Sequence, residues 1–592
     1  MTKKIPGVDL NKTNWFNRGT GAALFFCVLL ILSCDFPGNL PDGGTYLTVN
    51  LSGASGGRSG PTRSVLSDND TGGLAYKVTF TGPGGTVIER VAEGGSISIA
   101  LSAGAWSIAA EAYNPGDMGG TLVGSGTAAV TVVPGQPQSV TVPMYVDPAY
   151  EAGLTNIYIH NEAELRRIGT DFVIDGTINF YLEKDITLTQ PWTAIGSNSD
   201  PFKAVFDGQG HTVTIRSFGP AIKETGDVWV YQGFFAVVET AAIKNINVKY
   251  ELSGSVDIST GDGSTYHDSC AGGVAGQARN SSFEKIQVSG NFAILFDGMS
   301  SLNVGGIAGA SDNGTITNCH VVGAIGGTSA NYLPIGGIVG SSESGTIISD
   351  SSFTGAVNGS AVGNCIAGGI AGYMNGDITA SYTSAIVQGA GGGVYAGGIA
   401  GWLLTGSIDR CYAWANVSAD GTTDVYAGGI AGQNNFTITK CYVRGAVLGE
   451  NGSSEKYAGG IAGNIIGGTI EYCAALNDSI SFSSAVDVGG IGGREISGEI
   501  SSGSYTSNYA ASDIVISSTN TTTNLNLIGN TTYIRSNFEG PPAGTVYSTG
   551  NLNWDFASDW KWLSGYSYPV LSWQTTPPDL SFISDSLVFT WP

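Results

Sequence analysis

Charged residues are scarce in this chain: only 12% of its 592 residues are Asp, Glu, Lys or Arg. The charges are also unbalanced, because 48 acidic residues against 25 basic ones leave a formal net charge of −23. A strongly acidic surface is repelled by phosphate groups, so nucleic acid and anionic membrane surfaces are not expected partners. This thinly spread acidity fits a long, sheet-rich surface that has to stay soluble.

The residues from which metal and nucleophilic sites are usually built are also few. Only four histidines occur, and no H-E-x-x-H sequence of a zinc peptidase is present. The eight cysteines form no C-x-x-C pair, and the calcium-binding repeat G-G-x-G-x-D is missing. We therefore expect no metal site, no cofactor and no catalytic residue.

The N-terminal apolar run, residues 22–32, is eleven residues long, which is too short to span a bilayer as a helix. Four basic residues precede it, as in a secretory signal. The run ends in Ile-Leu-Ser-Cys at Cys34, which resembles a lipoprotein signal box. The small residue before the cysteine lets a peptidase reach the bond, and the thiol then takes a diacylglycerol.

We therefore predict a lipoprotein signal peptide at residues 1–34 and a lipid anchor at Cys34. The anchor would hold the chain to a membrane of the bacterial cell envelope, at the outer membrane or cell surface. The alternative is an ordinary secretory signal in which Cys34 is incidental.

Glycine, by contrast, is abundant, with 90 residues, and it is periodic. The pattern G-G-[IV]-[AVG]-G recurs eight times at intervals of 29 to 33 residues. Such a period indicates a stack of equivalent units, each too small to bury its own apolar face. The eight patterns begin at Gly272, Gly305, Gly336, Gly368, Gly397, Gly428, Gly459 and Gly489.

Each unit contains three short runs of β-branched or alternating residues, separated by Gly, Asn, Asp and Ser, and no amphipathic helix of ten residues. We predict an all-β fold in which residues 149–551 form a parallel β-helix, or solenoid, of about a dozen coils of about 30 residues each. A helical pattern at 161–168 would cap its N-terminal end, and the aromatic residues 552–592 would form a C-terminal cap and tail.

The residues before the repeats follow a different pattern. Residues 35–43 are rich in Gly, Pro and Asp and are predicted to be a tether. Residues 44–148 contain runs that alternate with a period of two, separated by glycine-rich turns. This pattern predicts an immunoglobulin-like β-sandwich domain, acting as a stalk between anchor and rod.

Aligning the repeats gives one position occupied only by small or apolar residues, so we expect this column to point inward. Buried free cysteine packs as a small hydrophobe, which is the favoured interpretation. A metal or redox ladder is the alternative, and disulfides between neighbouring coils remain open. The column consists of Ile286, Cys319, Ser351, Ser381, Cys411, Cys441, Cys473 and Gly503.

Residues next to this column should point outward, because side chains alternate along a strand. The outward residues Tyr382, Tyr412, Trp414, Tyr442 and Arg444 would then form one patch over three coils, here called the tyrosine patch. Tyr, Trp and Arg are the residue types of recognition hot spots, so the patch is the predicted binding site for a glycan or a protein. The alternative is a ladder that only stabilises the sheet.

A second tyrosine column lies two residues before the glycine pairs. It shares strand parity with isoleucines that should be buried, so packing in the core or at a corner is the expected role. The column consists of Tyr395, Tyr426 and Tyr457.

These units resemble the GLUG repeat, a bacterial motif of large surface proteins, some of which are adhesins or peptidases. The resemblance covers roughly residues 156–575, including an opening segment at 181–188 and a closing segment at 554–571. It implies a right-handed parallel β-solenoid at the cell surface. It supplies no catalytic residue, because the peptidases that contain this repeat use a separate metalloprotease domain.

We therefore expect a non-catalytic envelope lipoprotein, an adhesin or structural display rod that binds a glycan or a host or matrix protein, and not an enzyme. The alternative is a polysaccharide-active β-helix enzyme, a lyase or hydrolase. Such enzymes gather carboxylates on one outer face, whereas Asp377, Asp409 and Glu471 are scattered over different repeat positions in the alignment.

Overall fold

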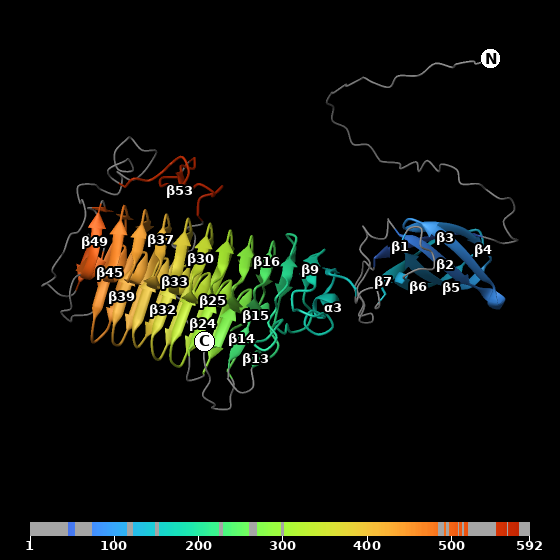
Figure 1. Cartoon of the computed structure of the whole chain (residues 1–592), viewed down its shortest axis with the longest axis horizontal. Helices are drawn as coiled ribbons and strands as arrows, with labels where there is room; N and C mark the ends of the chain where they lie inside the picture. Colours follow the sequence, from blue (N-terminus) through green and yellow to red (C-terminus); the bar gives the residue numbers. More distant parts are fainter. Residues whose placement is uncertain are drawn as a thin grey trace, which may run out of the picture.

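The computed structural model is all-β, with 61% of residues in strands and 2% in helix, as the sequence predicts. Figure 1 shows a small N-terminal domain followed by a long stack of parallel strands. Cys34 and the predicted tether lie outside the described residues. The structure describes residues 45–53, 74–114, 122–147, 153–223, 229–259, 269–297, 301–482, 491–492, 497–506, 508–511, 514–518, 552–564 and 566–578.

The N-terminal domain consists of seven strands in the order β3-β2-β5-β6-β7-β1-β4. Strands β6 and β7 are joined by only two residue pairs, so the strands form two halves around a shared core. The core contains the fully buried Tyr76 and Phe80 and the nearly buried Trp106. The immunoglobulin-like topology stays a prediction. The strands are β1 (Thr45–Gly53), β2 (Ala75–Thr81), β3 (Val87–Glu93), β4 (Ser96–Leu101), β5 (Gly104–Tyr113), β6 (Leu122–Val132) and β7 (Gln138–Val146).

A single-turn helix, α3 (Glu162–Leu165), lies at the N-terminal end of the solenoid, within the predicted helical pattern (Figure 1). It begins after Asn161, whose side chain accepts a hydrogen bond from the Glu164 backbone N–H at 3.0 Å. Asparagine at this position satisfies one of the free N–H groups of the first turn. The helix lies between the first two parallel strands, β8 (Asn156–Ile159) and β9 (Asn179–Leu182).

Each regular coil of the solenoid contributes strands to three sheets. In several coils the second sheet receives two strands, because its run breaks at a left-handed residue such as Asn313, with φ of +49°, or Gly406, with φ of +86°. In the preceding coil the same run is one continuous strand, β33 (Ala371–Thr379). The three runs predicted per repeat are therefore present. One coil consists of β35 (Val394–Gly397), β36 (Ala400–Thr405), β37 (Ser407–Asp409) and β38 (Tyr412–Gly421).

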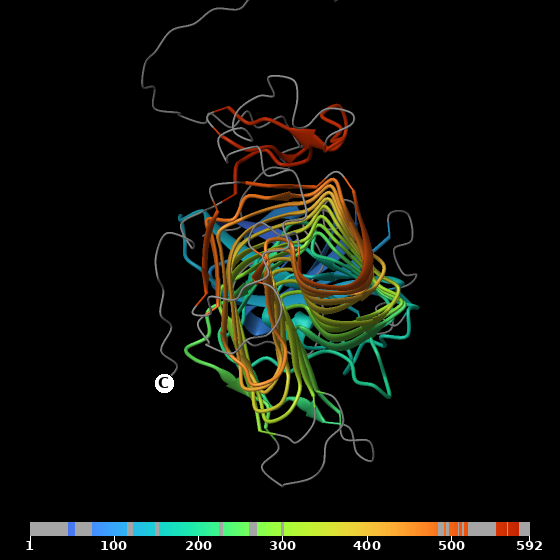
Figure 2. The same cartoon turned by 90° about the vertical axis from the view of Figure 1, so that its left-hand side faces the viewer.

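Equivalent strands pair in parallel from coil to coil. Strand β34 (Tyr382–Gly391) pairs with β38 in unbroken register, from Tyr382 opposite Tyr412 to Gly391 opposite Gly421. The solenoid completes about eight turns, fewer than the predicted dozen. The difference arises before Val230, where short strands do not complete the first sheet and β13 (Ile222–Lys223) joins it antiparallel. Figure 2 shows the coils end-on, with their outlines superimposed.

The repeated glycines mark a sharp corner between the first and second sheets. A Cβ atom on Gly397 would lie 2.0 Å from the Ala400 carbonyl oxygen, and one on Gly398 would lie 2.1 Å from the Gly429 oxygen of the next coil. Real Cβ atoms do not approach so closely, so any side chain would push the sheets or coils apart. Close backbone approach therefore explains the glycine repeat.

The predicted inward column is confirmed: Cys319, Cys411, Cys441 and Cys473 have no exposed surface. Its last member is Asn508, not Gly503, because Ala474 pairs with Tyr509 in the last coil. The Cys411 N–H donates to Cys441 Sγ at 3.4 Å, and all the described cysteines are free thiols.

A residue with left-handed backbone precedes each member of this column from Ile286 to Cys473. This conformation costs a residue with a side chain about 1 kcal/mol, and the coil-to-coil hydrogen bonds offset it. The Arg410 N–H, for example, donates to the Thr439 carbonyl of the next coil at 3.0 Å. The conformation turns the following side chain into the core. The residues are Lys285, Asn318, Asp350, Ala380, Arg410, Lys440 and Tyr472, with φ between 45° and 58°.

We expect the six described thiols to be unreactive towards a disulfide reagent in the native protein. Burial raises the pKa of the Cys319 and Cys365 thiols to about 12, so at about pH 8 only roughly one in ten thousand is ionised. Labelling should be measured by mass spectrometry in a chain with Cys27→Ala and Cys34→Ala. Denaturant should make all six reactive, and rapid native labelling of any of them would contradict the packing described above.

Candidate functional site

The aromatic C-terminal segment, residues 552–578, lies along the side of the solenoid instead of across its end (Figures 1 and 2). We call it the strap. Its short antiparallel pair is β52 (Trp560–Lys561) and β53 (Val570–Leu571). The Trp554 indole N–H donates to the Tyr472 carbonyl at 2.9 Å, and the Trp573 indole N–H donates to the Ala380 carbonyl at 2.8 Å. The strap thus crosses several coils, and the predicted capping of the C-terminal end is not the role of these residues.

The tyrosine patch lies where the sequence predicts, on the outer face of the third sheet, but the strap covers it. Tyr412 and Tyr442 have no exposed surface and Trp414 is 6% exposed, so the predicted exposure is wrong. Tyr412 stacks between Tyr382 and Tyr442, with ring centroids 4.9 Å apart on both sides. The alternative interpretation, a ladder that stabilises the sheet, is the arrangement found.

The strap is bound to the tyrosine patch by specific polar contacts as well as by ring packing. The Gln574 side-chain amide donates to the Tyr412 hydroxyl at 2.7 Å, and the Tyr442 hydroxyl donates to the Pro569 carbonyl at 2.8 Å. Buried Tyr hydroxyls need such partners.

The strap also contacts Arg444, the cationic residue of the tyrosine patch. The Arg444 guanidinium lies over two rings, 4.8 Å from the centroid of Trp414 and 4.5 Å from that of Tyr568 in the strap. Arg444, the fifth member of the patch, is half-buried, and the outer face here is an internal interface.

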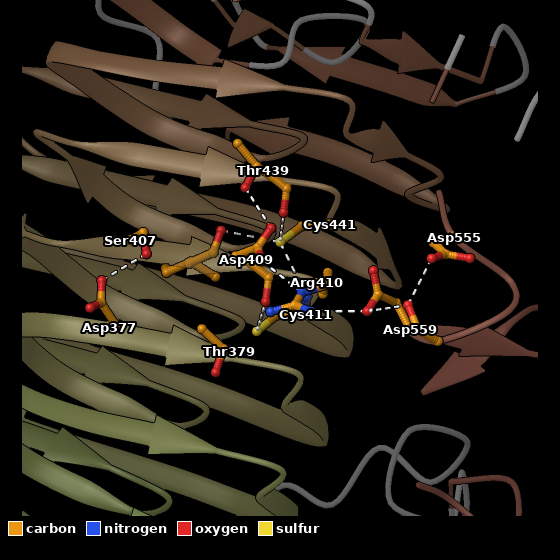
Figure 3. A network of polar contacts seen from close by, with 12 residues as sticks. Asp377, Thr379, Ser407, Asp409, Arg410, Cys411, Thr439, Cys441, Asp555 and Asp559 are labelled. Atoms are coloured by element: carbon orange, nitrogen blue, oxygen red, sulfur yellow. Dashed lines mark hydrogen bonds and ion pairs between the residues drawn. The ribbon is translucent and has the colours of Figure 1, made fainter. Parts of the chain in front are cut away.

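An ion-pair network joins the rod to the strap beside these rings (Figure 3). Arg410 Nε contacts Asp409 at 2.7 Å, and its Nη1 contacts Asp559 of the strap at 2.9 Å. Asp409 also accepts a hydrogen bond from the Thr439 hydroxyl of the next coil at 2.7 Å. Sequence reasoning missed Asp559, because its partner is 149 residues away along the chain.

The acidic residues of the rod are less scattered than the alignment indicates. Asp409 and Glu471 occupy one column of the second sheet, with Thr439 between them. Asp377 is on strand β33, and it accepts a hydrogen bond from the Ser407 hydroxyl at 2.7 Å. Among the described residues, no group of three or more His, Cys, Asp or Glu is placed to hold a metal ion.

His320 lies where the far end of the strap meets the rod. Its ring lies 5.3 Å from that of Trp573, its Nδ1 lies 2.9 Å from the Ser352 hydroxyl, and its Nε2 lies 3.0 Å from Asn318 Oδ1. Burial lowers the pKa of His320 below its ordinary value of 6.5, because the charged ring loses solvation.

A second set of aromatic side chains lies at the glycine corner, outside the main core. Tyr395 of the first sheet stacks on Trp402 of the second sheet at 5.3 Å, and Tyr373 meets Trp402 edge-on at 5.5 Å. Tyr426 continues the series at 5.0 Å from Tyr395, followed by Tyr457 at 5.4 Å. We call these five residues the corner row. The prediction of packing at a corner holds for its three first-sheet tyrosines.

The sequence contains a signal for the corner row that the analysis of single columns misses. Trp402 lies seven residues after Tyr395, and the two rings stack across the corner. Only the coil of Tyr395 has two aromatics at this pair of positions. Tyr373, Tyr395 and Trp402 are half-buried, whereas Tyr426 and Tyr457 are nearly buried.

No protein-family model matches this sequence. No curated protein matches it either. Several solved structures are similar to parts of it, including two with related names. One is the crystal structure of a candidate immunoglobulin A1 protease from Bacteroides ovatus at 1.30 Å resolution, with 19% identity, a TM-score of 0.30, and coverage of 71% of this chain and 93% of that one.

The second structure is named IgA1 Protease, with 13% identity, a TM-score of 0.26, and coverage of 69% of this chain and 28% of that one. These names contradict the prediction that the chain is not an enzyme, and we withdraw that prediction.

Trp560→Ala should release the strap from the rod. Trp560 is 1% exposed and stacks on Trp554 at 4.6 Å, so its truncation removes about 3 to 5 kcal/mol of packing. Hydrogen exchange of the backbone amides should then accelerate in residues 552–578 and in β38, which the strap covers. The amides of the first sheet should keep their protection. The half-buried Trp562→Ala is the matched control and should have a smaller effect. Unchanged exchange in Trp560→Ala would show that the strap is not held by this ring.

Docking of the strap should weaken in mild acid. The pKa of His320 is lowered in the folded chain from the value of about 6.5 that it has in the unfolded chain. The contribution of His320 to stability is therefore constant above about pH 6.5 and decreases as the pH falls towards the pKa of the folded chain. Exchange rates of residues 566–578 measured between about pH 7 and pH 5 should show this. His320→Gln should flatten the profile, and an equally steep profile in that variant would assign the effect to another group.

Proposed function

We propose that this chain is an anchored rod of the bacterial cell envelope, built from GLUG-type repeats, that displays a binding surface for a protein. The regular register of the solenoid carries this proposal. In β38 the inward residues Ala415, Val417 and Ala419 are buried, and outward residues such as Ser418 and Asp420 alternate with them. Outward positions can therefore change without disturbing the core, which suits a scaffold for recognition.

The order of the segments along the chain supports the same proposal. The predicted lipid anchor at Cys34 comes first, the seven-stranded domain follows as a stalk, and the rod comes last. Equivalent strands lie about 4.8 Å apart along the rod axis, so every turn carries the outer face further from the domain at the N-terminal end. Display at the outer membrane or cell surface is the arrangement in which this length is useful.

The anchor can be tested in a bacterium with two membranes by metabolic labelling with an alkyne analogue of palmitate. The wild-type chain should incorporate the label and fractionate with membranes, and protease added to intact cells should cleave it. Cys34→Ala should abolish the labelling and move the chain to the soluble fraction, because one polypeptide without acyl chains has no anchor. Cys27→Ala, in the apolar run, is the matched control and should behave as wild type. Labelling that persists in Cys34→Ala would refute the anchor.

A further inference from the structure

The corner row is an aromatic cluster of the described rod that the strap leaves partly exposed. Its rings lie outside the main core cluster, which contains the inward residues Ala396, Ile399 and Leu403 of the same coil. Tyr373, Tyr395 and Trp402 keep part of their surface exposed. Exposed aromatics grouped in this way are typical of recognition surfaces.

Two carboxylates border this cluster. Asp424 and Glu455 occupy the same position in adjacent coils, each one residue before a first-sheet strand, β39 (Val425–Gly428) and β44 (Lys456–Gly459). The Tyr426 hydroxyl donates to Glu455, and the Glu455 backbone N–H donates to Asp424 Oδ1 at 3.2 Å. Burial, followed by the charges of these two carboxylates, raises the pKa of Tyr395. The two carboxylates thus make the electrostatic potential at the rings negative.

Among the described residues, no lysine or arginine forms an ion pair with Asp424 or Glu455. Lys456 follows Glu455 directly but lies in the inward column of Val425 and is 2% exposed. Stacked aromatic faces with a carboxylate rim therefore remain open to a positive group from outside, which would interact with the ring faces and with the carboxylates together.

The same chain shows this kind of contact elsewhere, with the cation supplied. Arg444 lies over the Trp414 and Tyr568 rings and contacts the Asp478 carboxylate at 3.5 Å. Each of the two clusters contains one tryptophan, at least one tyrosine and a neighbouring carboxylate. Arg444 and the strap satisfy the cluster on the third sheet, whereas the corner row has the rings and the carboxylates but no guanidinium among the described residues.

We propose that the corner row binds an extended basic segment of a partner protein. Arginine or lysine side chains of that segment would lie over Tyr395, Trp402 and Tyr373 and pair with Asp424 and Glu455. Charge complementarity favours this occupant, since the chain carries a net charge of −23 and the rim is acidic. The inference rests on the proposed display function and names the partner class and the site.

The test uses the full-length chain with Cys34→Ala and a fluorescent, end-blocked peptide of about ten residues that alternates Arg and Ser. This alternation places the Arg side chains on one side of an extended peptide, about 7 Å apart. Fluorescence polarisation should show saturable binding that weakens with salt. The same peptide with citrulline, the uncharged isostere of Arg, should bind at least about tenfold more weakly, because each cation–π contact and ion pair is lost.

Variants then assign the binding to the corner row. Trp402→Ala should weaken it about tenfold, and Glu455→Gln should weaken it several-fold while keeping the shape of the rim. Tyr158→Ala is the matched control, because Tyr158 is an exposed ring stacked on Tyr181 at 5.4 Å in the first coil. Its binding should equal that of the parent chain. If circular dichroism shows that Trp402→Ala does not fold, Glu455→Gln and Trp402→Leu carry the test.

Absence of binding by the folded chain would overturn the proposal, as would equal binding of the Arg and citrulline peptides. Binding that survives both Trp402→Ala and Glu455→Gln would overturn it as well. None of these results affects the labelling and fractionation of the Cys34→Ala variant, so failure at the corner row is distinguishable from failure of the display function. If protease added to intact cells does not cleave the chain but the purified chain still binds the peptide, only the display function is refuted.

Discussion

The close approach of two sheets at the glycine corner is the constraint on which the rest of the solenoid depends. Gly398 leaves no room for a Cβ atom against the Gly429 oxygen of the next coil, and the same contact recurs from coil to coil. One coil therefore dictates the conformation of the next. The pairing of β34 with β38 in unbroken register follows from this stacking, and so does the straight inward column that contains Cys411 and Cys441.

Regular stacking has a consequence for the outer faces. Any large outward side chain that is repeated in successive coils forms a continuous apolar ladder, as Tyr382, Tyr412 and Tyr442 do. Exposed patches of this size are unfavourable in a soluble protein. The chain covers this ladder with its own strap. The Trp560 ring of the strap packs against Tyr442 of the ladder, and the Asp559 carboxylate pairs with Arg410. The corner row is a smaller ladder of the same origin and is left half-covered.

The sequence was sufficient for the parts of the fold that repeat. Period and glycine pattern predicted the parallel solenoid, and strand parity predicted the inward cysteines and the outward tyrosines correctly. It failed at the places where the repeat is broken. The last inward residue is Asn508 and not Gly503, because the final coil contains extra residues. The number of turns was overestimated, because the segments before Val230 lack a regular first sheet.

Local residue pattern by itself thus determined the fold class, the coil and the direction of each repeated side chain, because these depend on neighbours one or two residues away or one period away. Only the tertiary structure decided which outward surfaces stay open. Tyr412 meets Gln574, which is 162 residues further along the chain, and no period relates the two positions. A predicted binding patch became an internal interface for that reason, and the corner row stayed partly exposed because nothing distant in the described chain covers it.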